Sequence, residues 1–426
     1  MASAPQKKWH KLDNTANLFP VIASRRAANV FRMTAVQHDA VDPALLQKAL
    51  EDTLPYFAAF AVRLRHGLFW SYLEQNDAPV RVQPEQEAPC RYIDPLETGR
   101  YLFRVLYFGP RISLETFHVL TDGTGAMRFL KALCYRYCQL AHPEDFAEDG
   151  AMAPHGIEQA GNVENEYVRN YVPSNQQSTY KEVSAYRLHG EYRPSFDMGV
   201  ATLLVPLPTL KERCHAARAS VGEYLTAAML LAIAEEYLPA RGAKKPVGVF
   251  VPVDLRRIFG TDTSANFFSG MSIQRVFDTR RPSFEELLEE VKVQFSEKLT
   301  RETFAQKLAY TVRSEVDLKI RIIPLPLKNG VLRLIYEYSN RGNTITFSNL
   351  GPVEVESQFQ KYFEGFRFIL STTKQELIEC TAVAYAGTLA LTIATQLEDN
   401  ALAKNIARRL TSSGIPVTVE STGGGE

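Results

Sequence analysis

The sequence predicts an α/β protein with two domains, each built from helices packed against a mixed sheet. The chain has 426 residues and 45% hydrophobic content, which is enough for two or three domains with large cores. In both halves, stretches that alternate like strands are interspersed with stretches at helical spacing. Between the halves lies a polar, proline-containing stretch with neither pattern, so we expect one domain on each side of it.

We assign residues 1–150 to the N-terminal domain. Residues 28–37 alternate like a strand, and Asp42 follows as the N-cap of a helix. Residues 58–76 and 101–119 each predict two strands joined by a turn, because a glycine interrupts each alternating stretch. This half is therefore expected to hold several antiparallel strands.

We assign residues 151–195 to a crossover linker, 196–420 to the C-terminal domain and 421–426 to a disordered tail. The C-terminal domain is expected to contain a helix over 221–240 and either one long helix or two over 282–312. Its other predicted elements are strands over 198–208, 246–256, 343–351, 366–373, 379–387 and 388–397, and an amphipathic helix over 397–414.

Composition excludes several classes of function. Lysine plus arginine and aspartate plus glutamate each number 48, so there is no excess charge to attract nucleic acid or an anionic membrane. The N-terminus lacks the apolar segment of a secretory signal, and Gly387 interrupts the longest apolar stretch, so we expect no integral membrane segment. Five cysteines, few and odd in number, indicate a reduced, cytoplasmic protein, and no residue cluster has metal-ligand spacing.

The sequence HVLTDG stands where a predicted strand gives way to a helix. It places His118 at the strand end, with Asp122 and Gly123 at the turn. A neutral imidazole can accept a proton at cellular pH, and the strand end would fix its position. The aspartate can cap the helix or pair with an arginine, and glycine permits close approach to the backbone. The alternative is an ordinary strand-to-helix turn with an incidental histidine.

Two further loci lie in the second half. The segment VPVDLR holds Asp254 and Arg256, and NFF follows with Asn266. The segment SNLG, with Asn349, ends a later strand before a Gly-Pro turn. Each locus alone is weak evidence, because a charged strand end can simply be a solvated edge and Asn-Leu-Gly-Pro is ordinary turn chemistry.

Taken together and in this order, HxxxDG, PVDLR, NFF and SNLG resemble the CoA-dependent acyltransferase superfamily. This superfamily includes alcohol acetyltransferases, plant BAHD enzymes and the condensation domains of peptide synthetases. The N-terminal KLDNTANLFP is similar to that of bacterial alcohol-acetyltransferase-like proteins. The resemblance implies two chloramphenicol-acetyltransferase-like domains in a V shape, with a central tunnel between them.

The resemblance also implies roles for individual residues. His118 would be the general base, while Asp122 and Gly123 would support the site and Arg256 would pair with the aspartate across the domains. Two asparagines, at the NFF and SNLG motifs, would line the tunnel and bind substrate, namely Asn266 and Asn349. Condensation domains usually have two consecutive histidines, but here the first is Phe117, which favours simple acyl transfer.

The expected function is transfer of an acyl group from acyl-CoA to a hydroxyl, or less readily an amine, through a ternary complex. No metal and no tightly bound cofactor are expected, since the histidine supplies the base and acyl-CoA is a co-substrate. Paired cations at 25–26, 244–245 and 280–281 are candidates to bind the CoA phosphates. Two alternatives stay open: an acyl carrier protein could present the thioester, or the chain could be a non-catalytic binding protein.

Overall fold

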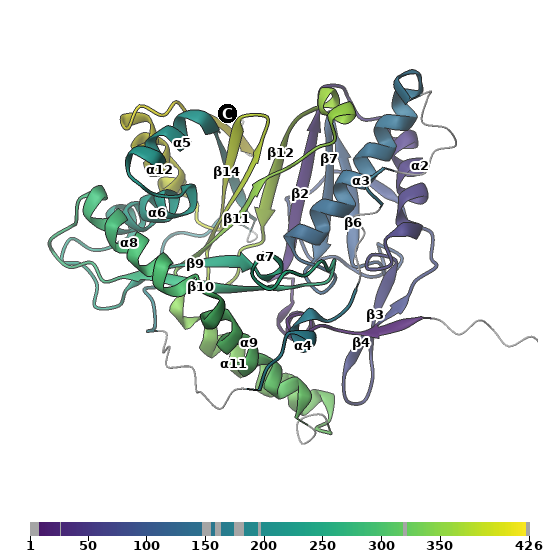
Figure 1. Cartoon of the computed structure of the whole chain (residues 1–426), viewed down its shortest axis with the longest axis horizontal. Helices are drawn as coiled ribbons and strands as arrows, with labels where there is room; N and C mark the ends of the chain where they lie inside the picture. The colour runs from purple at the N-terminus through teal and green to yellow at the C-terminus, as the bar shows by residue number, and fades with distance from the viewer. Residues whose placement is uncertain are drawn as a thin grey trace, which may run out of the picture.

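The structure, a computed structural model, describes residues 8–25, 27–146, 155–157, 163–173, 183–194, 197–317 and 322–422. A seven-stranded sheet and a five-stranded sheet, each covered by helices, lie side by side. A smaller, three-stranded sheet extends below the five-stranded one in the view of Figure 1. Both large sheets combine parallel and antiparallel pairs. The predicted α/β class with two mixed sheets is therefore confirmed.

The five-stranded sheet belongs mainly to the N-terminal half. Its order is β12 (Phe363–Leu370), β2 (Val30–Gln37), β7 (Arg111–Phe117), β6 (Phe103–Phe108) and β5 (Val82–Pro84). The helices α2 (Pro43–Thr53) and α3 (Gly123–Ala141) lie against it, and their apolar residues join those of the strands in one core. Asp42 caps α2 as predicted, accepting hydrogen bonds from the backbone of Ala44 and Leu45.

The seven-stranded sheet belongs to the C-terminal half. Its order is β10 (Phe268–Arg275), β9 (Val247–Asp254), β11 (Ile345–Pro352), β13 (Ile378–Tyr385), β14 (Thr388–Thr395), β8 (Gly199–Pro206) and β15 (Thr418–Thr422). The helices on its outer side are α5 (Leu207–Ala216), α6 (Val221–Tyr237), α8 (Phe284–Lys298) and α12 (Ala401–Ser412). Strand β11 is parallel to both of its neighbours.

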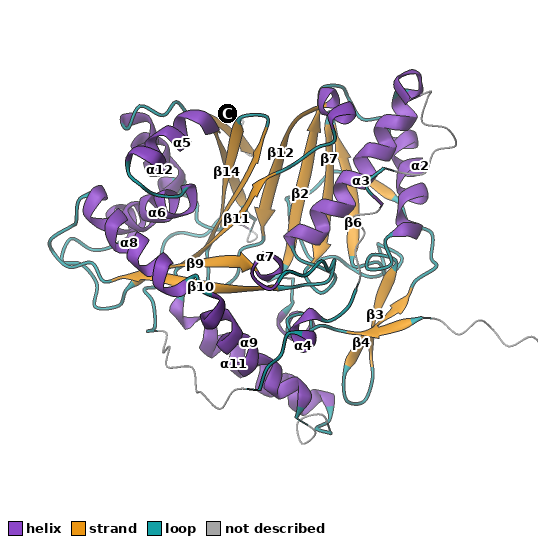
Figure 2. Cartoon of the chain, viewed as in Figure 1, coloured by secondary structure: helices purple, strands orange, loops and turns teal. Residues whose placement is uncertain are grey.

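The remaining elements are a small sheet, further helices and short 3₁₀ segments (Figure 2). The three-stranded sheet consists of β1 (Trp9–Lys11), β4 (Ser71–Gln75) and β3 (Val62–His66). The further helices are α1 (Phe19–Ile22), α4 (Glu166–Arg169), α7 (Leu255–Phe259), α9 (Arg301–Val316) and α11 (Leu325–Ser339). Short 3₁₀ segments are η1 (Leu54–Tyr56), η2 (Pro143–Phe146), η5 (Asn340–Gly342) and η6 (Ser357–Tyr362).

The C-terminal half contributes one strand to the N-terminal sheet. Strand β12 lies within residues 196–420, yet it pairs antiparallel with β2 and so forms the edge of the N-terminal sheet. It also packs against β13 and β14 of the other sheet. The expected division into 1–150 and 196–420 differs from the structure at this point, because an alternating pattern identifies a strand but not its partner.

Several elements differ from the sequence expectation. The region 282–312 forms two helices, with Thr300 capping the second. Strands β10 and β15 and helix α11 were not predicted. Strand β15 includes Ser421 and Thr422 of the expected tail, while 423–426 lie outside the described residues.

The expected linker contributes to the cores where it is described. Tyr167 packs in a cluster with Phe267 and Phe304, and Leu188 belongs to the core of the C-terminal half. Within the described residues, no single helix combines the length and apolar content needed to cross a membrane. Helices α5 and α6 reach that threshold only as a pair, and their axes meet at 85°.

Candidate active site

The HVLTDG sequence forms the predicted strand-to-helix turn. His118 directly follows β7, and Asp122 is the N-cap of α3. One carboxylate oxygen, Asp122 Oδ1, accepts hydrogen bonds from the backbone nitrogens of Thr124 at 3.1 Å and Gly125 at 3.3 Å. The cap fixes where the helix begins, because it satisfies backbone donors that have no partner within the helix.

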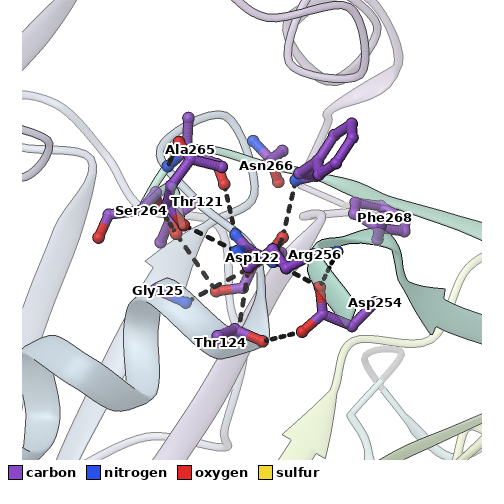
Figure 3. Close-up of polar contacts among 12 residues, drawn as sticks. Thr121, Asp122, Thr124, Gly125, Asp254, Arg256, Ser264, Ala265, Asn266 and Phe268 are labelled. Atoms are coloured by element: carbon purple, nitrogen blue, oxygen red, sulfur yellow. Dashed lines mark hydrogen bonds and ion pairs between the residues drawn. The ribbon is translucent and has the colours of Figure 1, made fainter. Parts of the chain in front are cut away.

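Asp122 also forms the predicted ion pair with Arg256 (Figure 3). Arg256 Nη1 lies 2.9 Å from Asp122 Oδ2, and Nη2 lies 3.0 Å from Oδ1, so the pair is bidentate. Each residue is only 5% exposed. Burial raises the pKa of Asp122, but the guanidinium and the N–H groups of Phe267 and Gly125 outweigh it and hold that pKa below its ordinary value.

The guanidinium of Arg256 connects several segments of the chain. Nε donates to the carbonyl of Thr263 at 2.7 Å, and Nη2 donates to that of Ala265 at 2.6 Å. Nη1 also contacts Asp254 Oδ1 at 3.0 Å, and Asp254 in turn accepts from Thr124 Oγ1 of α3 at 3.2 Å. We call Asp122, Arg256, Asp254 and Thr124 the ion-pair frame; it joins the two halves at the start of α3 (Figure 3).

The ring of His118 is held through one nitrogen. Nδ1 lies 3.0 Å from Asn266 Oδ1. The amide nitrogen of Asn266 donates to the carbonyl of His118 at 3.1 Å and to Asp13 Oδ2 at 3.1 Å, which orients the amide with its oxygen toward the ring. Nδ1 therefore carries the hydrogen, and Nε2 is the basic nitrogen.

Aromatic rings enclose the imidazole. Phe19 stacks on it with 4.5 Å between ring centroids, Phe31 meets it edge-on at 5.0 Å, and Phe268 lies at 5.3 Å. Burial lowers the pKa of His118, and the nearby charge of Asp122 only partly opposes this effect. The ring is consequently neutral at cellular pH and can accept a proton.

A cavity of about 1580 Å³ extends between the two halves. His118, Asp122, Gly123 and Asn349 all line it, together with the aromatic rings around the imidazole. Asn349 is exposed and uses its Oδ1 to accept from the backbone of Gly351 at 2.9 Å, so its amide NH₂ is the group it would offer a substrate.

Asn266 has a different position from the one expected. It is 1% exposed and is not among the residues that line the cavity. Its side chain contacts His118 and Asp13 instead, so it positions the imidazole rather than facing a substrate. The sequence could not distinguish these roles, because both require an asparagine at the junction.

The expected CoA-binding pairs do not line the cavity. Arg281 donates to the carbonyl of Pro239, Arg280 pairs with Glu286, and Arg26 lies outside the described residues. The cations that do line the cavity, so far as the chain is described, are Arg128, Lys131, Arg256, Arg257, Arg301 and Arg313.

The cysteines are not placed for catalysis. All five are free and buried. Cys134 and Cys138 lie in the core along α3, where burial raises the pKa of both thiols, that of Cys138 to about 12. Where the chain is described, one group of potential metal ligands lies within 4.8 Å, namely His142, Glu144 and Asp145. Asp145 is already bound by Lys361 and Tyr362, and none of the three lines the cavity.

Sequence reasoning missed several residues that build this site. Asp13 and Phe19 both lie within KLDNTANLFP, a segment for which the resemblance implied no chemical role. The hydroxyl of Tyr167 accepts from Thr15 and bonds to the backbone of Phe268, although it stands in the expected linker. At Gly125, a Cβ atom would lie 2.5 Å from the carbonyl oxygen of Ser264, so the DGTG spacing was the signal for close packing.

No family model matches the chain, and no curated protein matches its sequence. Solved structures do. Polyketide synthase associated protein 5 from Mycobacterium tuberculosis is 16% identical, with a TM-score of 0.61 and coverage of 95% of this chain and 97% of that one. TRI101 of F. sporotrichioides, solved with coenzyme A and T-2, is 11% identical, with a TM-score of 0.61 and coverage of 98% and 100%.

Wax ester synthase/diacylglycerol acyltransferase from Marinobacter aquaeolei VT8 is 16% identical, with a TM-score of 0.55 and coverage of 95% and 100%. The first condensation domain of the CDA synthetase is also similar, with 14% identity and a TM-score of 0.59. These proteins represent the CoA-dependent acyltransferase and condensation-domain superfamily, which the motifs resemble. The chain shares their fold over nearly its whole length.

Proposed function

We propose that the chain is a CoA-dependent O-acyltransferase, similar to alcohol acetyltransferases, which transfers an acyl group from acyl-CoA to a hydroxyl acceptor. The observation that carries the proposal is the state of His118. Asn266 holds its Nδ1, its ring is neutral, and it lines a cavity between two halves with an acyltransferase fold. A base in this state is what attack by a hydroxyl on a thioester requires.

In the proposed reaction, both substrates occupy the cavity together. As the acceptor oxygen attacks the thioester carbonyl, His118 Nε2 takes its proton, and a C–O bond forms. The tetrahedral intermediate then collapses, the C–S bond breaks, and the departing CoA thiolate receives the proton from the imidazolium. A positioned base typically contributes 10²–10⁴ in rate, and joint binding adds more.

The ion-pair frame has a structural role in this proposal. Asp122 is already paired with Arg256, so it holds the turn that positions His118 and does not take the proton. Gly123 begins α3 at the cavity wall, where a Cβ would lie 2.7 Å from Leu350 Cδ2, and its small size keeps this wall open. Asn349 is the proposed substrate-binding amide.

We assign the CoA phosphates to cations at the cavity wall. Arg128 and Lys131 lie one turn apart on α3, and Arg257 lies on α7. TRI101 was solved with coenzyme A bound, which supports a CoA thioester. The condensation domains among the similar structures favour a carrier-protein thioester as the alternative donor. We place the reaction in the cytoplasm, where the five free cysteines would stay reduced.

The proposal is tested by release of free thiol from a series of acyl-CoA chain lengths, with a panel of alcohols and amines. His118→Ala should lower turnover at least about 10²-fold without unfolding the protein. The exposed His38 provides the matched control, and His38→Ala should leave turnover unchanged. Retention of activity by folded His118→Ala would contradict the proposed base.

The same assay tests the order of events. Direct transfer in a ternary complex predicts intersecting initial-rate lines when both substrates are varied. It also predicts an unchanged protein mass after incubation with acyl-CoA alone, because Cys134 and Cys138 are buried in the core. Parallel lines with a stable acyl adduct would replace this mechanism with a covalent one.

A further inference from the structure

Two acidic residues outside the ion-pair frame line the same cavity as His118. Glu379 lies on β13, and Glu376 lies two residues before that strand. Their exposed fractions are 4% and 6%, so both carboxyl groups are almost fully removed from bulk water. We call these two residues the acidic pair. The mechanism proposed above makes no use of it.

The carboxyl oxygens of the acidic pair are incompletely satisfied. Glu376 Oε2 accepts from Thr346 Oγ1 at 3.2 Å, and Glu376 also has side-chain hydrogen bonds with Asn343 and with Glu379. When both groups are ionised and act only as acceptors, Glu376 Oε1 and Glu379 Oε2 have no donor. An unpaired buried acceptor costs free energy comparable to a lost hydrogen bond. A proton shared between the two carboxyl groups satisfies these oxygens when no ligand is bound. Once that proton leaves, the cavity presents two acceptor oxygens that need donors from a ligand.

The negative charge of the acidic pair is also only partly balanced within the protein. Burial and the neighbouring Glu376 carboxyl raise the pKa of Glu379 well above its ordinary value, so the two groups share one proton. Arg187 is a cation whose charge acts on Glu376, and Arg341 lies close enough to act on Arg187. Arg187 balances one negative charge, while Tyr336 and Asn343 nearby carry none. A second ionised carboxylate would need a cation from a ligand.

We propose that the acidic pair binds the ammonium group of an acceptor whose opposite end carries the hydroxyl that is acylated, such as an amino alcohol. This inference rests on the proposed function and specifies its acceptor. An ammonium group offers three donors and no acceptor, which matches the two carboxylate oxygens that remain once the shared proton has left. Its binding would release the shared proton to water and leave two carboxylates facing Arg187 and the ligand cation.

The path from the acidic pair to His118 follows one wall of the cavity. Phe31 contacts the imidazole at 5.0 Å and the ring of Phe368 at 6.2 Å. The carbonyl of Phe368 accepts from Thr381 Oγ1, and Thr381 stands two residues from Glu379 on the same face of β13. An acceptor with an apolar chain between its two polar ends would lie along these rings.

The matched probes are linear ω-amino alcohols, from 3-aminopropan-1-ol to 8-aminooctan-1-ol, each with its n-alkanol and its diol. Glu376→Gln and Glu379→Gln should each raise KM for the best amino alcohol at least about tenfold, and change KM for the matched alkanol less than about twofold. Glu354 lines the same cavity but is exposed, so Glu354→Gln is the control and should change neither KM.

Calorimetry separates this proposal from the proposed function, because it needs no turnover. Titration of the wild-type protein with the amino alcohols in buffers of different ionisation enthalpy should show release of up to about one proton per bound ligand. Glu379→Gln should abolish that release. If no acceptor is acylated but this binding occurs, the proposed function fails and the acidic pair stands as a cation site. Absence of binding by every amino alcohol, equal effects on alkanols, or diols that bind as well would overturn it.

Discussion

The ion-pair frame and the acidic pair each place a buried carboxyl group on the wall of one cavity, yet they are built differently. Asp122 is 5% exposed and accepts from a guanidinium and three backbone nitrogens. Glu379 is 4% exposed and has an oxygen with no partner. The pKa of Asp122 is lowered and that of Glu379 is raised. Equal burial thus gives opposite preferences for the charged form.

This contrast teaches that burial alone does not identify a binding group. A buried carboxylate whose oxygens are all occupied is part of the structure, because a ligand could bind it only by displacing a partner. A buried carboxyl with unpaired oxygens in a cavity is available to a ligand. The predictions below test this distinction, from the largest expected effect to the smallest.

Removal of one partner should affect the frame far more than the acidic pair. Asp122→Ala leaves the buried guanidinium of Arg256 with Asp254, which is partly exposed, as its remaining acidic partner. Loss of one partner of a buried pair typically costs about 3–5 kcal/mol in the free energy of unfolding. Glu379→Gln removes no ion pair and should change stability by less than about 1 kcal/mol. Urea denaturation of both variants measures the difference. Equal losses would show that the acidic pair is structural as well.

The frame also depends on close approach of α3 to the loop before β10. A Cβ on Gly125 would lie 2.0 Å from Thr121 Oγ1 and 2.5 Å from the backbone oxygen of Ser264, so the loop must move. Gly125→Ala should lower the free energy of unfolding by about 1–3 kcal/mol, the usual range for overpacking. Gly123→Ala is the control, because its nearest neighbour is the flexible end of Leu350. A milder effect at Gly125 than at Gly123 would contradict the geometry.

The two sites should give opposite dependences of stability on pH. Asp122 has a lowered pKa when folded, so its contribution is present above its ordinary value of 3.8 and is lost as pH falls toward the folded pKa. Glu379 has a raised pKa, so stability falls as pH rises above its ordinary value of 4.5. Each group can change the free energy of unfolding by at most about 1.4 kcal/mol per pH unit.

Thermal denaturation from acid to neutral pH measures both slopes. Glu379→Gln should flatten the decline above pH 4.5 and leave the acid limb unchanged. Arg256→Met should remove the contribution of Asp122 at the acid limb, at a cost in overall stability. An unaltered profile in Glu379→Gln would mean that this carboxyl ionises normally.

The sequence predicted those parts of the fold and site that depend on local pattern. Helix caps, hairpins and the strand-to-helix turn at His118 follow from residue spacing, and all are present. The pairing of Asp122 with Arg256 followed from the family resemblance, which carries long-range information that spacing alone does not. The fold class was predictable for both reasons.

Other features depend on which segments meet in space. The role of Asn266 depends on Asp13, which lies 253 positions away. The partners of Glu376 and Glu379 depend on which strands flank β13. A sequence pattern shows one acid in a strand and one just before it, but not the residues that they meet. Helix α11 was missed because Pro326 and Gly330 interrupt its apolar spacing.

The placement of β12 in the N-terminal sheet has a consequence for how the protein is made. All eight residues of β2 are buried, and β2 lies between β12 and β7. The ribosome releases β2 long before β12, and at roughly 5–20 residues per second the delay is on the order of twenty seconds to a minute. Throughout that interval β2 is an unprotected sheet edge, which is a template for pairing with other chains. A chaperone would therefore be needed while the N-terminal half is nascent. It would no longer be needed once β12 pairs with β2 and closes the sheet.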